Sequence, residues 1–109
     1  MVFDAGTGAG RCNLFDMSGR LVSYAYREWE YLKDLSSSNK EAMLFDAEQF
    51  KKILFSLCRK VIKQAGISAD EVVAVSATSQ REGMVWLDRF GKEIYAAPSV
   101  DLRGEEAAD

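Results

Sequence analysis

Histidine is absent from this sequence of 109 residues, and proline occurs only once. Without histidine the chain has no Ser-His or Cys-His catalytic pair and lacks a common ligand of zinc sites. The single proline and the eight glycines argue against a disordered or fibrous chain. Any catalysis by these residues must therefore use carboxylates, arginine, backbone dipoles or a metal bound by carboxylates.

A basic stripe and long apolar runs are also missing. The net charge is −3 with both signs spread along the chain, whereas nucleic-acid-binding domains are typically basic. No run approaches the ~20 apolar residues that span a bilayer, and residues 1–4 do not resemble a signal peptide. Cys12 and Cys58 show no CxxC spacing, which favours reduced, buried thiols. We therefore expect a cytoplasmic protein that binds neither nucleic acid nor membrane.

The residues that are present suit one globular domain with a single core. Hydrophobic residues make up 48% and charged residues 28% of the chain, and the length allows one domain at most. Three strands joined by short turns are predicted first, as an antiparallel meander. The strands are expected at residues 1–3, 11–16 and 21–29, with turns at 4–10 and 17–19.

A helix is predicted after an exposed loop at residues 32–44. Asp46 is placed to cap its start, with Gln49 at the capping-box position, and Gly66 is placed to end it. Apolar residues recur at helical spacing and predict the buried face: Phe50, Ile53, Leu54, Leu57, Cys58, Val61, Ile62 and Ala65. The cations between them indicate a solvated face: Lys51, Lys52, Arg59, Lys60 and Lys63.

The second half of the chain predicts one buried strand and one hairpin. Residues 72–77 are nearly all apolar or small, which is typical of a central strand covered on both sides. The polar residues 78–83 follow at its carboxyl end, the edge at which open α/β sheets bind ligands. Further strands are expected at 84–88 and 93–95 around a turn at 89–91, followed by a helix-like segment at 104–109.

The glycine-rich segment from Asp4 to Arg11 is the first candidate site. Glycines in a hairpin loop let backbone N–H groups converge on a phosphate. Thr7 adds a hydroxyl donor, and Asp4 could hold a phosphate-bound Mg²⁺ directly or through water. Glycine content alone favours a structural turn, and the segment is neither a Walker loop nor a GxGxxG that opens a helix.

The motif in this segment resembles the first phosphate loop of the actin/hexokinase superfamily, Asp-x-Gly-Thr-x-x-x-Arg. The resemblance implies an α/β, ribonuclease-H-like half-domain: the three-strand meander, the helix and a parallel central strand. It also implies that Asp4 binds the metal. The residues that would bind the phosphates of ATP are Gly6, Thr7, Gly8 and Arg11.

Residues 75–83 resemble the strand that lines the sugar pocket of FGGY carbohydrate kinases. Glycerol kinases carry Asn-Gln-Arg-Glu where this chain has Ser79-Gln80-Arg81-Glu82. In the family the arginine and glutamate hydrogen-bond polyol hydroxyls, and a guanidinium with a carboxylate supplies the donors and acceptors that vicinal diols need. The resemblance therefore implies substrate contacts from Gln80, Arg81 and Glu82.

A third match lies at residues 99–103, where the family carries Trp-x-Asp-x-Arg. Asp101 and Arg103 match, but Ser99 stands at the tryptophan position, which argues against the usual glycerol- or xylulose-type pocket. The resemblance adds Asp101 to the predicted substrate residues. By itself Arg81-Glu82 would be interpreted as an exposed ion pair, but three matches in the family's order favour a sugar site.

The resemblance implies an ATP-dependent carbohydrate kinase with ATP and Mg²⁺ as cofactors and a small sugar as substrate; a homodimer is left open. Residues 43–46, 74–77 and 100–103 are similar to autoinducer-2 kinases, which phosphorylate a linear signalling sugar. Glycerol, xylulose and other polyol or ketose kinases are the alternative. The family's catalytic aspartate and adenine-binding domain lie downstream. Residues 1–109 are therefore expected to be an N-terminal fragment of the first kinase domain that is inactive alone. We expect it to be cut at its C-terminal end, and a cut at the start of its first strand is left open.

Two alternatives lack sugar chemistry: a non-catalytic interaction module with this fold, and an actin-like filament protein. The presence of Asp4, Thr7, Arg81 and Glu82 argues against both, because a scaffold has no physical need of them.

Overall fold

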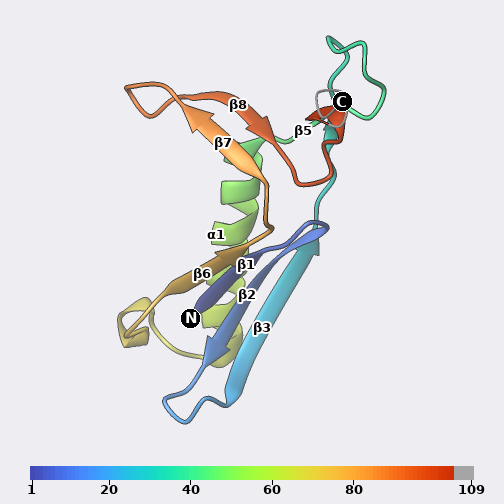
Figure 1. Cartoon of the computed structure of the whole chain (residues 1–109). Helices are drawn as coiled ribbons and strands as arrows, with labels where there is room; N and C mark the ends of the chain where they lie inside the picture. Colours follow the sequence, from blue (N-terminus) through green and yellow to red (C-terminus); the bar gives the residue numbers. More distant parts are fainter. Residues whose placement is uncertain (105–109) are drawn as a thin grey trace. The chain divides into compact units, whose positions relative to one another are not determined.

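The structure is a computed structural model that describes residues 1–104 (Figure 1). Apart from Gly104, the segment predicted as helix-like at 104–109 lies outside the described residues. The chain forms two compact units, whereas its length alone predicted one domain. The sheet unit contains residues 1–29 and 49–79, and the hairpin unit contains residues 30–48 and the described residues from 80 onward.

The sheet unit contains a four-stranded sheet in the order β3-β2-β1-β6 (Figure 1). β1 (Val2–Ala5), β2 (Ala9–Phe15) and β3 (Leu21–Glu28) pair antiparallel, which confirms the predicted meander. A short 3₁₀ helix, η1 (Ala69–Glu71), precedes β6 (Ser76–Ser79). β6 pairs parallel to β1, as predicted.

The position and burial of β6 differ from the prediction. A central strand was expected over residues 72–77, but β6 begins at Ser76 and lies at the edge of the sheet in the described part of the chain. All four of its residues are exposed, and Val73 and Val75 before it are 79% and 61% exposed. An apolar run indicates extended chain, but it does not show whether a second neighbour pairs with it.

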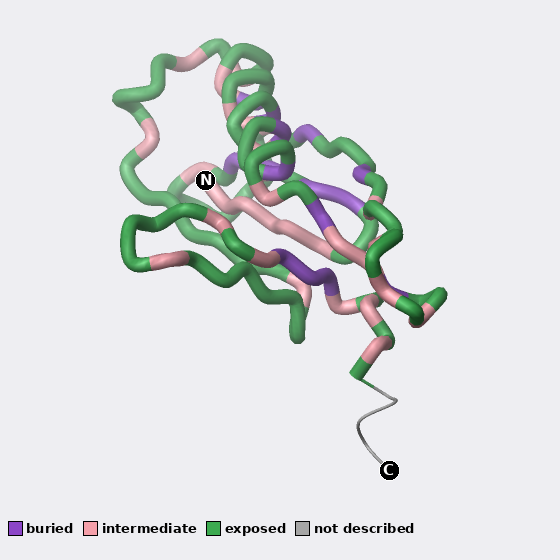
Figure 2. Tube along the Cα trace, turned by 90° about the horizontal axis from the view of Figure 1, so that it is seen from above, coloured by how far each residue is buried: buried purple, intermediate pink, exposed green. Residues whose placement is uncertain are grey.

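α1 (Ala47–Ala65) covers one face of this sheet (Figure 1). It begins directly after Asp46, and Gly66 follows its end with a φ of 68°, the left-handed conformation predicted for this glycine. The helix buries Phe50, Ile53, Leu57 and Val61, and the strands below it bury Cys12, Leu14 and Ala25. Buried parts of the chain are purple in Figure 2. The predicted cationic face is exposed. Within residues 1–104 no helix has both the length and the apolar character needed to cross a bilayer.

Both cysteines are free thiols in the sheet unit. Cys12 is completely buried and Cys58 is half-buried. Burial, together with the neighbouring Cys58, raises the pKa of Cys12 to about 11, so this group stays a protonated thiol at neutral pH. This agrees with the prediction of reduced thiols.

The hairpin unit consists of two small antiparallel pairs. β4 (Leu32–Lys33) pairs with β5 (Met43–Leu44), and β7 (Met84–Leu87) pairs with β8 (Glu93–Ala97). The hairpin of β7 and β8 was predicted. The prediction of an exposed loop at 32–44 was wrong at both ends, because these form β4 and β5, and Ala42 is buried. The Asp34 N–H donates to the Ala42 carbonyl (3.0 Å), which closes the segment between the two short strands.

Gly10 occupies a place in β2 where a side chain does not fit. An ideal Cβ there would lie 2.7 Å from Cζ3 of Trp29 and 3.1 Å from Cδ2 of Leu54 in α1. Real Cβ atoms essentially never approach a ring carbon as closely as 2.7 Å. The missing side chain therefore allows both the Trp29 ring and the helix to approach the strand.

We predict that Gly10→Ala lowers the free energy of unfolding by about 1–3 kcal/mol, the usual cost of adding a methyl group to a filled core. Urea unfolding followed by circular dichroism measures the change. Gly8→Ala is the matched control, because a Cβ at Gly8 meets nothing within 4 Å and should change stability by less than about 0.5 kcal/mol. Equal stability of the two variants would contradict this account of Gly10.

Candidate functional site

The predicted phosphate-binding residues lie together where β1 turns into β2. The Gly6 N–H donates to the Ala9 carbonyl (3.0 Å) and closes the turn. Asp4 and Arg11 lie opposite each other on the paired strands, and Arg11 Nη1 donates to Asp4 Oδ2 at 3.0 Å. Their side chains are 29% and 50% exposed. Asp4 belongs to β1 rather than to the predicted turn, so the sheet determines which way it faces.

The two glycines of this turn have different surroundings. A Cβ on Gly6 would lie 3.2 Å from Arg11 Nη1 and 3.4 Å from the Ala9 carbonyl oxygen, so the turn itself leaves little room there. Packing does not explain the glycine at position 8, since a Cβ would meet no described atom within 4 Å. Glycine also occurs where a ligand approaches the backbone closely, and Gly8 leaves space for such a ligand.

Thr78, the first of the polar residues predicted at the ligand-binding edge, is in the same row as the Asp4–Arg11 pair. Asp4 is opposite Thr78 in β6, and Arg11 is opposite Tyr26 in β3. Directly paired residues project from the same face of a sheet. Their neighbours along the strands, such as Cys12, are buried beneath α1, so this row lies on the sheet face opposite the helix.

Trp29 is a feature that the sequence did not indicate. Its backbone N–H donates to the Gly8 carbonyl (3.2 Å), and its indole N–H donates to the Thr7 carbonyl (3.1 Å). The residue is 8% exposed, and its ring stacks on Phe50 with centroids 4.0 Å apart. In the sequence Trp29 only ended an alternating strand pattern, and no local signal connected it with the glycine turn.

In the hairpin unit, the predicted sugar loop follows β6 directly, and the side chain of Gln80 anchors it. Gln80 Oε1 accepts hydrogen bonds from the N–H and the hydroxyl of Ser99 (2.9 and 2.7 Å). Its Nε2 donates to the Tyr31 hydroxyl (3.3 Å). Gln80 was predicted to contact a substrate, and here its amide group connects three segments of the unit.

Glu82 is not a glycine, yet its backbone has the left-handed conformation, with a φ of 63°. This conformation costs roughly 1–2 kcal/mol for a residue with a Cβ, and such strain is common at functional sites. A Cβ on Gly83 would lie 3.0 Å from Cγ of Gln80, so the glycine leaves room for the anchoring side chain. Arg81 and Glu82 themselves are exposed.

Asp101, another predicted substrate residue, holds Arg103 in a nearly buried network. Arg103 Nε lies 3.0 and 2.8 Å from the two Asp101 oxygens, and Arg103 Nη1 donates to Asp34 Oδ2 at 2.8 Å. Asp101 also accepts from the Met43 N–H and the Tyr95 hydroxyl, both at 3.3 Å. The Asp101 and Asp34 side chains are 7% and 11% exposed.

These contacts determine the charges in the network. Burial alone would raise the pKa of Asp101, but hydrogen bonds from Arg103 and from the Met43 N–H outweigh it and lower the pKa. Hydrogen bonds from the Ser36 hydroxyl and N–H lower the pKa of Asp34, and Arg103 adds to the effect. Both groups are therefore carboxylates at neutral pH, beside a permanently charged guanidinium.

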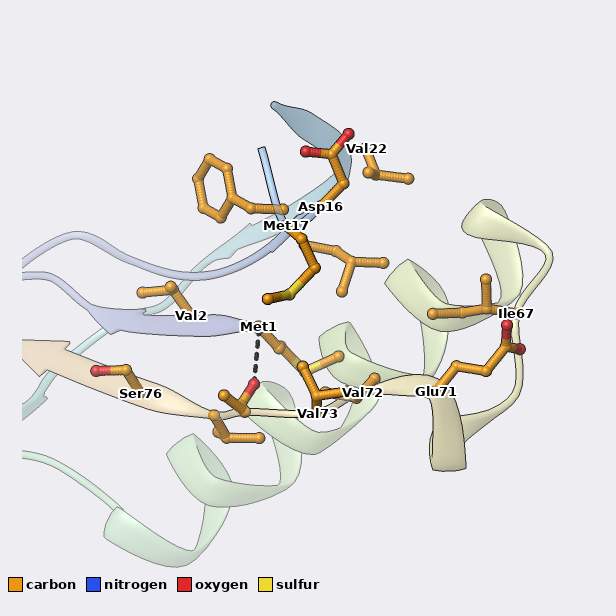
Figure 3. Close-up of a pocket in the computed structure, with 14 residues that line it drawn as sticks. Met1, Val2, Asp16, Met17, Val22, Ile67, Glu71, Val72, Val73 and Ser76 are labelled. Atoms are coloured by element: carbon orange, nitrogen blue, oxygen red, sulfur yellow. Dashed lines mark hydrogen bonds between the residues drawn. The ribbon is translucent and has the colours of Figure 1, made fainter. Parts of the chain in front are cut away.

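An apolar pocket of about 510 Å³ lies at the other end of the sheet from the glycine turn (Figure 3). Met1, Val2, Val22 and Ile67 are among its lining residues, and the Met1 amino group donates to the Ala74 carbonyl (2.9 Å) beside it. The sequence did not predict this pocket.

The predicted site residues thus form two groups, one in each unit. The sheet unit brings together Asp4, Gly6, Thr7, Gly8 and Arg11; the hairpin unit contains Gln80, Arg81, Glu82 and Asp101. Over the described range, no cluster of three or more Cys, Asp and Glu residues is suited to a metal. Asp4 is the predicted metal-binding carboxylate beside the glycine turn, and its side chain is part-exposed.

Residues 1–108 match the model of the N-terminal domain of the FGGY family of carbohydrate kinases. The chain belongs to this family. Over 105 residues it is 38% identical to the autoinducer-2 kinase of Yersinia enterocolitica and 36% identical to that of Salmonella typhimurium. Each match covers 94% of the chain and 19% of the relative, so the chain spans about a fifth of the length of these curated relatives.

Solved structures of FGGY-type sugar kinases have the same fold. A xylulose kinase from Rhodospirillum rubrum superposes with a TM-score of 0.74 at 21% identity. A Plasmodium falciparum glycerol kinase, determined with ADP, gives 0.75 at 23% identity. Each match covers 97% of this chain and 21% of the solved chain. The predicted α/β fold class is therefore confirmed.

We predict that Arg103→Met lowers the free energy of unfolding at pH 7 by about 2 kcal/mol, because it removes the guanidinium that donates to both charged carboxylates. A carboxylate whose pKa is lowered on folding contributes stability above its unfolded pKa of about 4, and this is lost as the pH falls through the folded pKa. The difference between wild type and variant should therefore shrink between pH 7 and pH 3, as measured by urea unfolding.

Arg89→Met is the matched control for this arginine, because Arg89 lies over the Phe90 ring in the exposed turn between β7 and β8. It should change stability little at either pH. A penalty for Arg103→Met that is the same at both pH values would contradict the charged network.

Proposed function

We propose that this chain is the N-terminal part of an ATP-dependent carbohydrate kinase whose substrate is an autoinducer-2-type signalling sugar. The observation that carries the proposal is the Asp4–Arg11 pair, held in register beside a glycine turn with open space over Gly8. The exposed Arg81 and Glu82 on an anchored loop support it. The catalytic base and the adenine site would come from residues outside this chain, which spans a fifth of its relatives.

The glycine turn would bind the phosphates of ATP. Thr7 and the backbone of Gly6 and Gly8 would supply neutral donors, and the part-exposed Arg11 would supply positive charge. Phosphoryl transfer depends chiefly on positioning and charge neutralisation, which these groups provide.

Asp4 suits the Mg²⁺ that accompanies ATP. Its carboxylate is part-exposed at the end of β1, and it has one oxygen hydrogen-bonded to Arg11. Mg²⁺ is usually held by one or two protein carboxylates together with substrate phosphates and water, so a single carboxylate fits. Bound there, the ion would neutralise charge on the transferring phosphoryl group.

Arg81 and Glu82 would bind the hydroxyls of the sugar. The guanidinium supplies donors and the carboxylate supplies acceptors for neighbouring hydroxyls. Gln80 and Asp101 remain predicted substrate contacts, in addition to holding Ser99 and Arg103 as the structure shows.

The substrate choice rests on sequence identity and on Ser99. The 35–38% identity with several autoinducer-2 kinases favours a linear signalling sugar. Ser99 stands at the tryptophan position of the family motif, which argues against the usual glycerol- or xylulose-type pocket. The fold similarity to xylulose and glycerol kinases keeps these sugars as the second candidates. A cytoplasmic location belongs to the same proposal, because both cysteines are free and ATP is the phosphoryl donor.

We predict that Asp4→Asn lowers kcat about a hundredfold and leaves the KM for the sugar nearly unchanged, because an electrostatic contact worth roughly 3 kcal/mol to the transition state is lost. A coupled ADP-release assay on the complete gene product, with autoinducer-2 precursor, glycerol and xylulose, measures both constants and ranks the sugars. Residues 1–109 alone should give no sugar-dependent turnover.

Asp16→Asn is the matched control, because Asp16 also accepts from an arginine, Arg20 Nε, at 3.0 Å in the next turn of the same sheet. It should retain the wild-type kcat. A wild-type kcat in Asp4→Asn would mean that the glycine turn is only structural, and no activity on any sugar would favour the interaction module.

Arg81→Ala and Glu82→Ala should each lower kcat/KM for the sugar by about 10- to 150-fold, the cost of removing a charged hydrogen-bond partner from a substrate hydroxyl. The KM for ATP should change little. Arg89→Ala, an exposed arginine of the same unit, serves as the control and should behave as wild type. If both variants keep the wild-type kcat/KM for every sugar, the sugar-site assignment fails.

A further inference from the structure

We infer that Trp29 is the positioning residue of the candidate phosphate turn: its two hydrogen bonds orient the backbone so that the Gly8 N–H is presented to a phosphate. The inference rests on the proposed function and adds to it a residue that the family motif Asp-x-Gly-Thr does not contain. All the contacts involved lie within the sheet unit.

The hydrogen bonds of Trp29 determine the orientation of a peptide unit in the turn. The Thr7 carbonyl, which accepts from the indole N–H, belongs to the same peptide unit as the Gly8 N–H. In a planar trans peptide the C=O and the N–H point to opposite sides. Because the carbonyl faces Trp29, the Gly8 N–H faces away from it.

The second hydrogen bond fixes the next peptide unit. The Gly8 carbonyl accepts from the Trp29 backbone N–H at 3.2 Å, so two consecutive carbonyls of the turn accept from one residue. Gly8 is exposed, and a Cβ there would meet nothing within 4 Å. The turn therefore keeps the Thr7 and Gly8 carbonyl oxygens on the Trp29 side and leaves space at Gly8 for an anion to approach the backbone.

The position of the indole is itself determined by packing. The ring is nearly parallel to that of Phe50 in α1, with an interplanar angle of 11° and centroids 4.0 Å apart. On β2, the missing side chain of Gly10 makes room for the ring. Phe50 of α1 and the space at Gly10 of β2 thus determine the position of the indole ring, and the hydrogen bond from its N–H determines the orientation of the Thr7 carbonyl.

Tryptophan suits this position because it combines a large apolar ring with one N–H donor. Phenylalanine would retain the stacking and most of the volume but would remove the donor to Thr7. Trp29→Phe therefore separates the orientation of the turn from the packing of the core.

In the complete gene product, Trp29→Phe should raise the Kd for ADP, measured by titration calorimetry, about tenfold. The KM for the sugar should stay within twofold of wild type. Hydrogen–deuterium exchange should become faster in peptides that cover residues 6–9 and stay unchanged over β3. Trp86→Phe is the matched control, because its indole N–H contacts only the sulfur of Met84 in the exposed β7 among the described hydrogen bonds. It should leave the Kd for ADP unchanged.

Phe50→Leu provides a second test that holds even if Trp29→Phe fails to fold. It retains both hydrogen bonds but removes the stacking partner, so it should weaken ADP binding in the same direction by a smaller factor. Unchanged ADP binding in the folded variants would overturn the inference, and so would equal weakening of ADP and sugar binding with uniformly faster exchange. A wild-type protein that binds no ADP would instead refute the proposed function.

Discussion

The close contact of Trp29 with Gly10 and Phe50 is the constraint on which the sheet unit depends. An aromatic ring beside the strand is possible only because Gly10 has no side chain, and it stays in place because the helix supplies a parallel ring. Packing of this kind contributes on the order of 1 kcal/mol beyond the apolar area that it buries. The same ring reaches the glycine turn, so the core of the unit and its candidate site share one side chain.

The hairpin unit is held together differently. Its strands are short, β4 and β7 are exposed, and a network of charged residues connects its segments. Arg103 connects Asp34, Asp101 and the Met43 carbonyl, which belong to segments about sixty residues apart in the sequence. Gln80 makes similar connections to Ser99 and Tyr31. The loop that bears Arg81 and Glu82 is therefore positioned by polar contacts.

Local patterns in the sequence predicted the helix and most strands well, but they predicted the pairing partners and the burial of these elements less well. The meander, α1 and the hairpin of β7 and β8 follow from alternation, helical spacing and turn residues, which are properties of neighbouring positions. The edge location of β6 and the pairing of β4 with β5 depend on partners that are distant in the sequence. The same distinction applies to the site: Asp4 and Arg11 were found through a short motif, whereas Trp29 and Thr78 become neighbours of the turn only through the fold.

The register of β1 and β2 makes the length of the glycine turn more important than its composition. Asp4 faces Arg11 because three residues, 6–8, separate the strands. Side chains alternate between the two faces of a sheet, so a shift of one residue in either strand would point Asp4 or Arg11 toward α1. An insertion or deletion in the turn would thus bury a charge and separate the ion pair at the same time. Over evolution this segment should therefore accept substitutions but keep its number of residues. Without a bound ligand, packing restricts the residue at position 8 the least.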